Sequence, residues 1–393
     1  MTESSDSARP RASKFALFNL GFRPFYLLAS VFAAVSIALW ALEYSGHLPR
    51  GYLQSPLWHG HEMLFGYTIA VIAGFLFTAV RNWTGQPTPT GPTLALLALL
   101  WLLGRVLVPT RFGVAAALVD AAFPIAVAAG IAVPLVRSGN RRNYFFAALL
   151  VLLALLAMVF HLAYAGVIAW PVRVSLQLAL DIVLFIMVVM GGRVIPMFTN
   201  NAIPGTQARR VRGVESAALG SVVALFIADL LQLPGIALVL ITAFAAAAHL
   251  LRLALWQPWR TLRTPLVWIL HASYAWIVVH LALRALALGG LVAEPLATHA
   301  LTIGAVGGLT IGMMTRTARG HTGRTLIADG YETACYVLVQ LAAIVRVFGA
   351  MVLASAYRDT VLVSAALWVA AFTIYAIRYW PVLAYPRMDG KPG

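Results

Sequence analysis

Apolar segments of about 20 residues follow one another along almost the whole chain, separated by short polar links. Each is long enough to cross the ~30 Å hydrocarbon core of a bilayer as a helix. The sustained alternation of polar and apolar residues that marks a membrane β-barrel is missing. We therefore predict an all-α integral membrane protein with about 12 transmembrane helices. The predicted segments are 24–43, 58–80, 92–109, 113–136, 143–167, 171–191, 213–232, 234–256, 265–288, 296–316, 331–354 and 360–381.

The links between these segments are too short for a soluble domain. Many of them carry glycine and proline, as in "GQPTPTGP" (Gly85–Pro92) and "AIPGTQ" (Ala202–Gln207). We predict one transmembrane domain over residues 24–381, preceded by a polar tail over 1–23 and followed by a tail over 382–393. The polar start, "MTESSDSARPRASK", argues against a cleaved signal peptide.

Composition and charge agree with a membrane location. The 393 residues are 61% hydrophobic and only 10% charged, whereas a soluble domain carries about a quarter charged residues. The formal charge of +15 does not indicate nucleic-acid binding, because the basic residues sit in short links, as topology signals do. With the N-terminus in the cytoplasm, 21 of the 28 basic residues face that side, and both termini are predicted to be cytoplasmic. The seven others are Arg50, Arg105, Arg111, Arg173, Arg284, Arg346 and Arg358.

Histidine is the most informative residue type in the chain, with nine copies. Ionisable residues inside membrane segments are costly, so function is the default hypothesis, and imidazole is the commonest ligand of transition metals and binds haem iron. Four are predicted in the outer half of the membrane: His59, His61, His161 and His299. Three are predicted toward the cytoplasm: His249, His271 and His321, the last in a link. One grouping on each side suggests a porphyrin and a second metal.

His59 and His61 flank Gly60 in "LWHGHEMLFG" (Leu57–Gly66). On a continuous helix, residues two apart point about 200° apart. Either the helix begins after both histidines, which then converge on one ion, or they serve different sites. Glu62 can bond a ligand imidazole, carry protons, or simply favour the start of a helix through the helix dipole.

Other charged residues have two readings each. Arg193 and Arg324 suit haem propionates, or they anchor helix ends on the cytoplasmic side. Asp120 and Asp181 lie within predicted helices, where a carboxylate must be paired or protonated. They either relay protons or pair with arginines such as Arg105 and Arg173.

Five motifs in the chain resemble one known family, the NnrS family. They are "NLGFRPFYLLA" (Asn19–Ala29), "WHGHEMLFGYTIAVIAGFLFTAVRNWTG" (Trp58–Gly85), "LWLLGR" (Leu100–Arg105), "GGRVIPMFTNNA" (Gly191–Ala202) and "THALTIGAVGGLTIGMMTRTARGHTGR" (Thr298–Arg324). The resemblance implies a multi-pass protein of the bacterial inner membrane that binds haem b and copper. It also implies a link to denitrification and to tolerance of nitric oxide.

The candidate site residues come from these motifs and the histidine sorting. The candidate metal ligands are His59, His61, His271, His299 and His321, and the candidate haem-binding residues are His271, His321, Arg193 and Arg324. Glu62 is the candidate catalytic group.

Two classes of function follow. The first is binding of nitric oxide, or its reduction to N2O with electrons from a quinol or a small redox protein. Carboxylates beside histidines would then deliver protons. The alternative is a multi-pass transporter of a metal or small solute, in which histidines line a proton or ion pathway.

Overall fold

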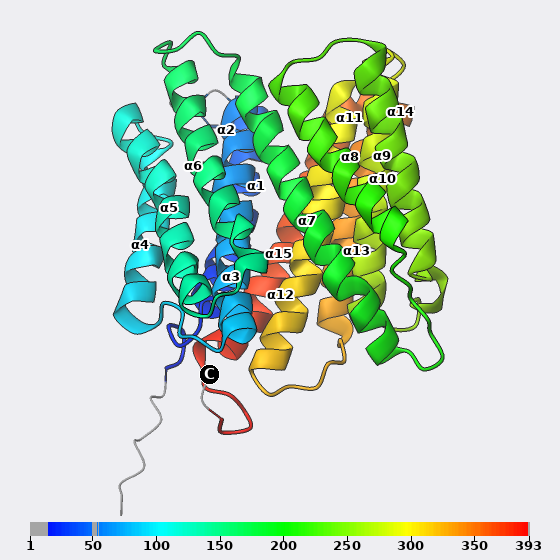
Figure 1. The fold of residues 1–393 in the computed structure, drawn as a ribbon. Helices are drawn as coiled ribbons and strands as arrows, with labels where there is room; N and C mark the ends of the chain where they lie inside the picture. The colour runs from blue at the N-terminus through cyan, green and yellow to red at the C-terminus, as the bar shows by residue number, and fades with distance from the viewer. Residues whose placement is uncertain (1–14, 49–52, 54, 392–393) are drawn as a thin grey trace, which may run out of the picture.

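The computed structural model describes residues 15–48, 53 and 55–391, and within these residues it contains helices and no strand (Figure 1). The principal helices of the first half are α1 (Phe22–Tyr44), α2 (Ser55–His61), η1 (Glu62–Thr68), α3 (Ile69–Thr84), α4 (Gly91–Leu107), α5 (Gly113–Arg137), α6 (Phe145–Tyr164) and α7 (Val172–Ala202). Those of the second half are α8 (Arg212–Leu230), α9 (Ile236–Leu255), α10 (Pro265–Leu288), α11 (Glu294–His299), η4 (Ala300–Gly307), α12 (Gly308–His321), α13 (Gly330–Ile344), η5 (Val345–Gly349), α14 (Ala350–Val352) and α15 (Tyr357–Ala384).

Eleven helical segments in the described part of the chain are long and apolar enough to cross a membrane. The predicted segment 92–109 corresponds to α4, which is apolar but only 17 residues long. Several spans are composite: α2, η1 and α3 form one stretch over Pro56–Thr84. The prediction of an all-α, multi-pass membrane protein is confirmed.

Two predicted links are helical instead. The sequence predicts that a segment ends at residue 191, but α7 continues to Ala202 through Gly192 and Pro196. Glycine and proline lower helix propensity, yet here the missing side chain of Gly192 leaves room for the guanidinium of Arg252. His321, predicted in a link, is the last residue of α12.

The two ends of the described chain lie on the same side of the bundle (Figure 1). The backbone N–H of Ala16 donates a hydrogen bond to the carbonyl of Ala384 at 2.7 Å. This closure brings α1 against α15, which pack along each other. Which side faces the cytoplasm stays a prediction of the positive-inside rule.

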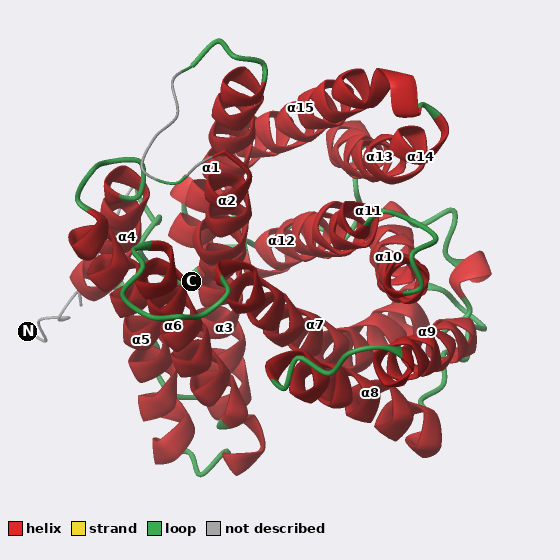
Figure 2. Cartoon of the chain, turned by 90° about the horizontal axis from the view of Figure 1, so that it is seen from above, coloured by secondary structure: helices red, strands yellow, loops and turns green. Residues whose placement is uncertain are grey.

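Seen from above, α1 to α6 form one group of helices, and α7 to α15 extend away from it (Figure 2). The two groups meet where α6 and η1 contact α7 and where α15 packs on α1. Wide π-helical turns, which are frequent at functional sites, stand on both sides of this junction as η1 and η4.

Candidate functional site

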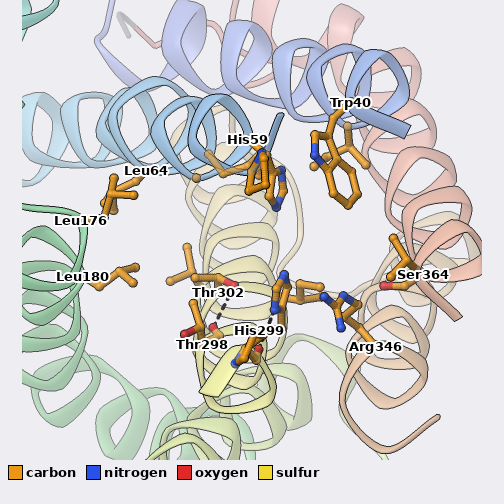
Figure 3. Close-up of a pocket in the computed structure, with 18 of the residues that line it drawn as sticks. Trp40, His59, Leu64, Leu176, Leu180, Thr298, His299, Thr302, Arg346 and Ser364 are labelled. Carbon is orange, nitrogen blue, oxygen red and sulfur yellow. Dashed lines mark hydrogen bonds between the residues drawn. The ribbon is translucent and has the colours of Figure 1, made fainter. Parts of the chain in front are cut away.

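A cavity of about 410 Å³ lies between the two groups of helices. Its lining comes from α1, α2, η1, α7, α11, η4, η5 and α15. Most of that lining is apolar, with residues such as Leu64, Leu176 and Leu180 on one side (Figure 3). We call this space the central cavity.

His59 and His299 face each other across the central cavity (Figure 3). Their ring centroids are 6.3 Å apart and their planes differ by only 9°. The indole of Trp40 stacks on His59, with centroids 4.4 Å apart. The Nδ1 of His299 donates to the carbonyl of Pro295 at 2.6 Å, which leaves the Nε2 of that neutral imidazole with a free lone pair.

The two histidines have similar local settings. His59 lies in the short helix α2 just before the π-helix η1, and His299 ends the short helix α11 just before the π-helix η4. Glycine makes the neighbouring packing possible, because a Cβ at Gly304 would meet the ring of Trp276. Two separate segments thus bring one imidazole each to the same cavity.

Arg346, on η5, is the buried cation of the central cavity. Its Nη2 donates to the hydroxyl of Tyr357 at 2.9 Å. Its Nη1 is buried and has no hydrogen-bond partner among the described residues. A buried guanidinium with a spare donor is suited to an anionic group.

His61 turns away from the cavity into a second, closed group of side chains. We call it the His61 cluster; its members are His61, Glu62, Arg105, Asp120 and His161, all of them buried. They come from α2, η1, α4, α5 and α6. The alternative in which the helix begins after both histidines is wrong, because both lie in α2, and their rings face different surroundings.

The contacts of the His61 cluster are short and almost entirely ionic. His61 Nδ1 lies 2.9 Å from Glu62 Oε1, and His61 Nε2 lies 2.8 Å from Asp120 Oδ2. Arg105 bridges the two carboxylates, with Nη1 at 2.7 Å from Glu62 Oε2 and Nη2 on Asp120 Oδ1. His161 Nε2 is 3.7 Å from Asp120 Oδ2.

Two predicted pairings can be compared with these contacts. Asp120 pairs with Arg105, as one reading predicted. Asp181 does not pair with Arg173 but lies 3.5 Å from Arg284 and accepts a hydrogen bond from Gln177 at 2.9 Å. Helix neighbours decide such pairs, and the sequence does not give them.

The inner histidines do not form one site. His271 Nε2 lies 2.8 Å from the hydroxyl of Thr199, whereas His321 packs on Phe22 with centroids 5.7 Å apart. His249 Nδ1 lies 2.6 Å from the hydroxyl of Tyr274. The structure therefore brings together the outer candidates in pairs and leaves His271 and His321 in separate surroundings.

The two candidate arginines also lie apart from the central cavity. Arg193 donates to Asn143 Oδ1 at 2.7 Å and lines a second cavity of about 420 Å³ with Arg142 and Arg210. Arg324 lies near His321, just beyond α12. Neither is positioned to hold a group bound between His59 and His299.

Sequence reasoning did not select Arg346, Asp120 or His161 as site residues. The signal was present in each case, because each is an ionisable residue inside an apolar segment. What was missing was the identity of their neighbours, which come from distant segments.

These features define a class: a polytopic helical membrane protein with a histidine-lined internal cavity. The model of the NnrS protein family matches residues 16–387, so the chain belongs to the NnrS family, which is linked to the nitric oxide response. This confirms the resemblance seen in the motifs. A comparison with curated proteins gives no match.

Proposed function

We propose that this protein binds haem b and copper in the bacterial inner membrane and that nitric oxide binds in its central cavity. The facing imidazoles of His59 and His299 carry the proposal. Their ring centroids are 6.3 Å apart, so each imidazole could offer a ring nitrogen to a metal group held in the cavity.

The surroundings of the two rings fit a porphyrin. The volume of about 410 Å³ falls within the roughly 300–1,000 Å³ of cofactor pockets. The apolar lining suits a flat macrocycle, and the free donor of Arg346 suits a propionate. His271, His321, Arg193 and Arg324 lie elsewhere, so their proposed role in haem binding has no geometric support.

Each side chain has a definite part in this proposal. Haem iron, when bound, would supply the binding of nitric oxide and the exchange of electrons. His299, held by the carbonyl of Pro295, presents its Nε2 to the cavity. Trp40 fixes the plane of His59. The leucines exclude water while admitting a small neutral gas that dissolves in lipid.

Reduction is a further step with its own requirements. Joining two molecules of nitric oxide into N2O and water takes two electrons and two protons. A quinol or a small redox protein would supply the electrons. Glu62 stays the predicted proton carrier, although it does not line the central cavity and bonds to His61 and Arg105.

The test is to purify the protein from membranes, measure iron and copper per chain, and record reduced spectra with and without nitric oxide. We expect a Soret band that shifts with nitric oxide and that is lost in His59→Ala and His299→Ala. His47→Ala is the matched control, because His47 is exposed outside the cavity. Consumption of nitric oxide with and without a reductant separates reduction from binding.

A colourless, metal-free but folded preparation would reject the proposal. The histidine-lined cavity would then belong to a transporter, the alternative class. A Soret band retained in both cavity variants would reject the ligand assignment alone.

A further inference from the structure

The His61 cluster lies outside the central cavity, and the proposed function does not explain it. Its five side chains are at most 6% exposed. Burying two carboxylates, a guanidinium and two imidazoles is expensive. The cluster therefore needs a physical account of its own.

The charges of the cluster do not balance. Glu62 and Asp120 contribute two negative charges and Arg105 contributes one positive charge, so neutral histidines leave one negative charge uncompensated. An unpaired charge in the interior of a membrane protein is too costly to persist. One further cation must reside among these side chains, either a proton or a metal ion.

The geometry at Asp120 accommodates a metal ion as the balancing cation. His61 Nε2 and Asp120 Oδ2 are 2.8 Å apart, yet both atoms lack a hydrogen-bond partner of acceptable geometry. Both atoms are buried, and each can serve as a ligand of an ion held beside the contact.

A third donor, from His161, lies close to these two atoms. One ligand atom each from His61, Asp120 and His161 lies within 4.8 Å of the others, and His161 Nε2 is 3.7 Å from Asp120 Oδ2. Ligands at about 2.0–2.2 Å from one metal ion lie roughly 3–4 Å from each other. A small closure of His161 toward Asp120 completes such a set.

We propose that His61 Nε2, Asp120 Oδ2 and His161 Nε2 bind one transition-metal ion of the class that takes imidazole and carboxylate together, namely iron(II), copper or zinc. Glu62 accepts a hydrogen bond from His61 Nδ1 and so directs the Nε2 lone pair to the ion. Arg105 orients both carboxylates from behind.

This site is separate from the central cavity, and where its ion is copper the inference rests on the proposed function and gives the copper of that function a site. The two sites use different faces of the same helical stretch, with His59 on one and His61 on the other. Loss of haem from the cavity and loss of the ion from the cluster are therefore independent events.

The experiment measures metals per chain by mass spectrometry in protein purified from cells supplied with iron, copper and zinc. We expect about one ion beyond any haem iron, reduced at least tenfold in Asp120→Asn and His161→Gln, in line with the usual loss on removing a ligand or its support. His299→Ala is expected to keep this ion. Asp181→Asn is the matched control, because Asp181 is an equally buried carboxylate outside the cluster.

A second measurement covers the case in which the cluster variants fail to fold. Wild-type protein loaded with copper(II) should show an electron paramagnetic resonance signal split by two nitrogens. Wild-type protein without a non-haem ion, or variants that keep it, would overturn the proposal and leave a proton as the balancing cation. Loss of the ion from Asp181→Asn would overturn it as well.

Discussion

His59 and His61 are separated by one glycine, yet their surroundings differ in almost every respect. His59 borders an open cavity, with a stacked indole and a second imidazole across the space. His61 has a carboxylate oxygen within 3 Å of each ring nitrogen. The face of the helix that carries His59 borders the central cavity, and the face that carries His61 is packed against charged side chains. The same residue type thus has two different settings. A histidine whose ring borders a cavity can take a ligand, whereas a histidine with a carboxylate at each ring nitrogen belongs to a structural or metal-holding cluster.

We expect the free energy of unfolding to depend more on the His61 cluster than on the residues of the central cavity. Among the described residues, Arg105 is the only arginine in contact with Glu62 and Asp120, so Arg105→Met leaves both carboxylates buried without it. Breaking a buried ion network this way costs about 3–5 kcal/mol. We expect a large fall in the apparent melting temperature in detergent, or no folded protein. Arg173→Met, on the exposed rim of the central cavity, should melt close to wild type.

A smaller effect is expected from the glycine that lets Arg105 reach the cluster. A Cβ at Gly66 would lie 2.7 Å from Arg105 Nη1 and 2.8 Å from Phe32 Cε1. Gly66→Ala should destabilise the protein by about 1–3 kcal/mol through overpacking. Gly60→Ala is the control on the same helical stretch, because its Cβ would meet only Leu176 at 3.4 Å. Equal melting of the two variants would show that the close approach is not limiting.

On the open side, loss of a histidine should hardly matter to the fold. His59→Ala removes a half-buried ring that stacks on Trp40 and has no ion pair in the described structure. We expect the free energy of unfolding of the metal-free protein to fall by about 1 kcal/mol, the usual size of a lost aromatic contact. If His59→Ala melts as low as Arg105→Met, the contrast between the two faces is wrong.

A capping residue outside the membrane-spanning segments gives an effect of similar size and serves as a reference for both faces. Asp329 caps α13, accepting hydrogen bonds from the backbone of Tyr331 and Glu332, and it pairs with Arg378 at 3.0 Å. Partial burial raises the pKa of Asp329, but the hydrogen bonds from Arg378 and the helix backbone outweigh it and hold the pKa below its usual value.

Because that pKa is lowered in the folded state, its stabilising contribution is complete above the ordinary pKa of about 3.9 and is lost as pH falls through the lower, folded value. Asp329→Ala should lower the free energy of unfolding by about 1 kcal/mol at pH 7. It should also weaken the fall of the melting temperature at acid pH. Asp329→Asn keeps the cap without the charge, so it should retain part of the stability but not the pH dependence.

The sequence determined the membrane class, the positions of most helices and the pool of residues from which the sites are built. These follow from local properties: the length of an apolar run, the position of links, and the rarity of histidine and aspartate in such runs. The five sequence motifs also indicated membership of the NnrS family. Helix ends at Ala202 and His321 were misjudged because glycine, proline and polar residues weaken a helix locally, while neighbouring helices support it.

The partners of each residue were decided only by tertiary structure. His59 meets His299 and His61 meets Asp120 across 240 and 59 positions of chain, and no local pattern encodes which helices become neighbours. The two-residue spacing on α2 points the two rings in different directions, and the missing side chain at Gly66 leaves room for Arg105 beside the His61 cluster. That choice depends on packing between helices, because identical imidazoles acquire different chemistry from the groups brought against them.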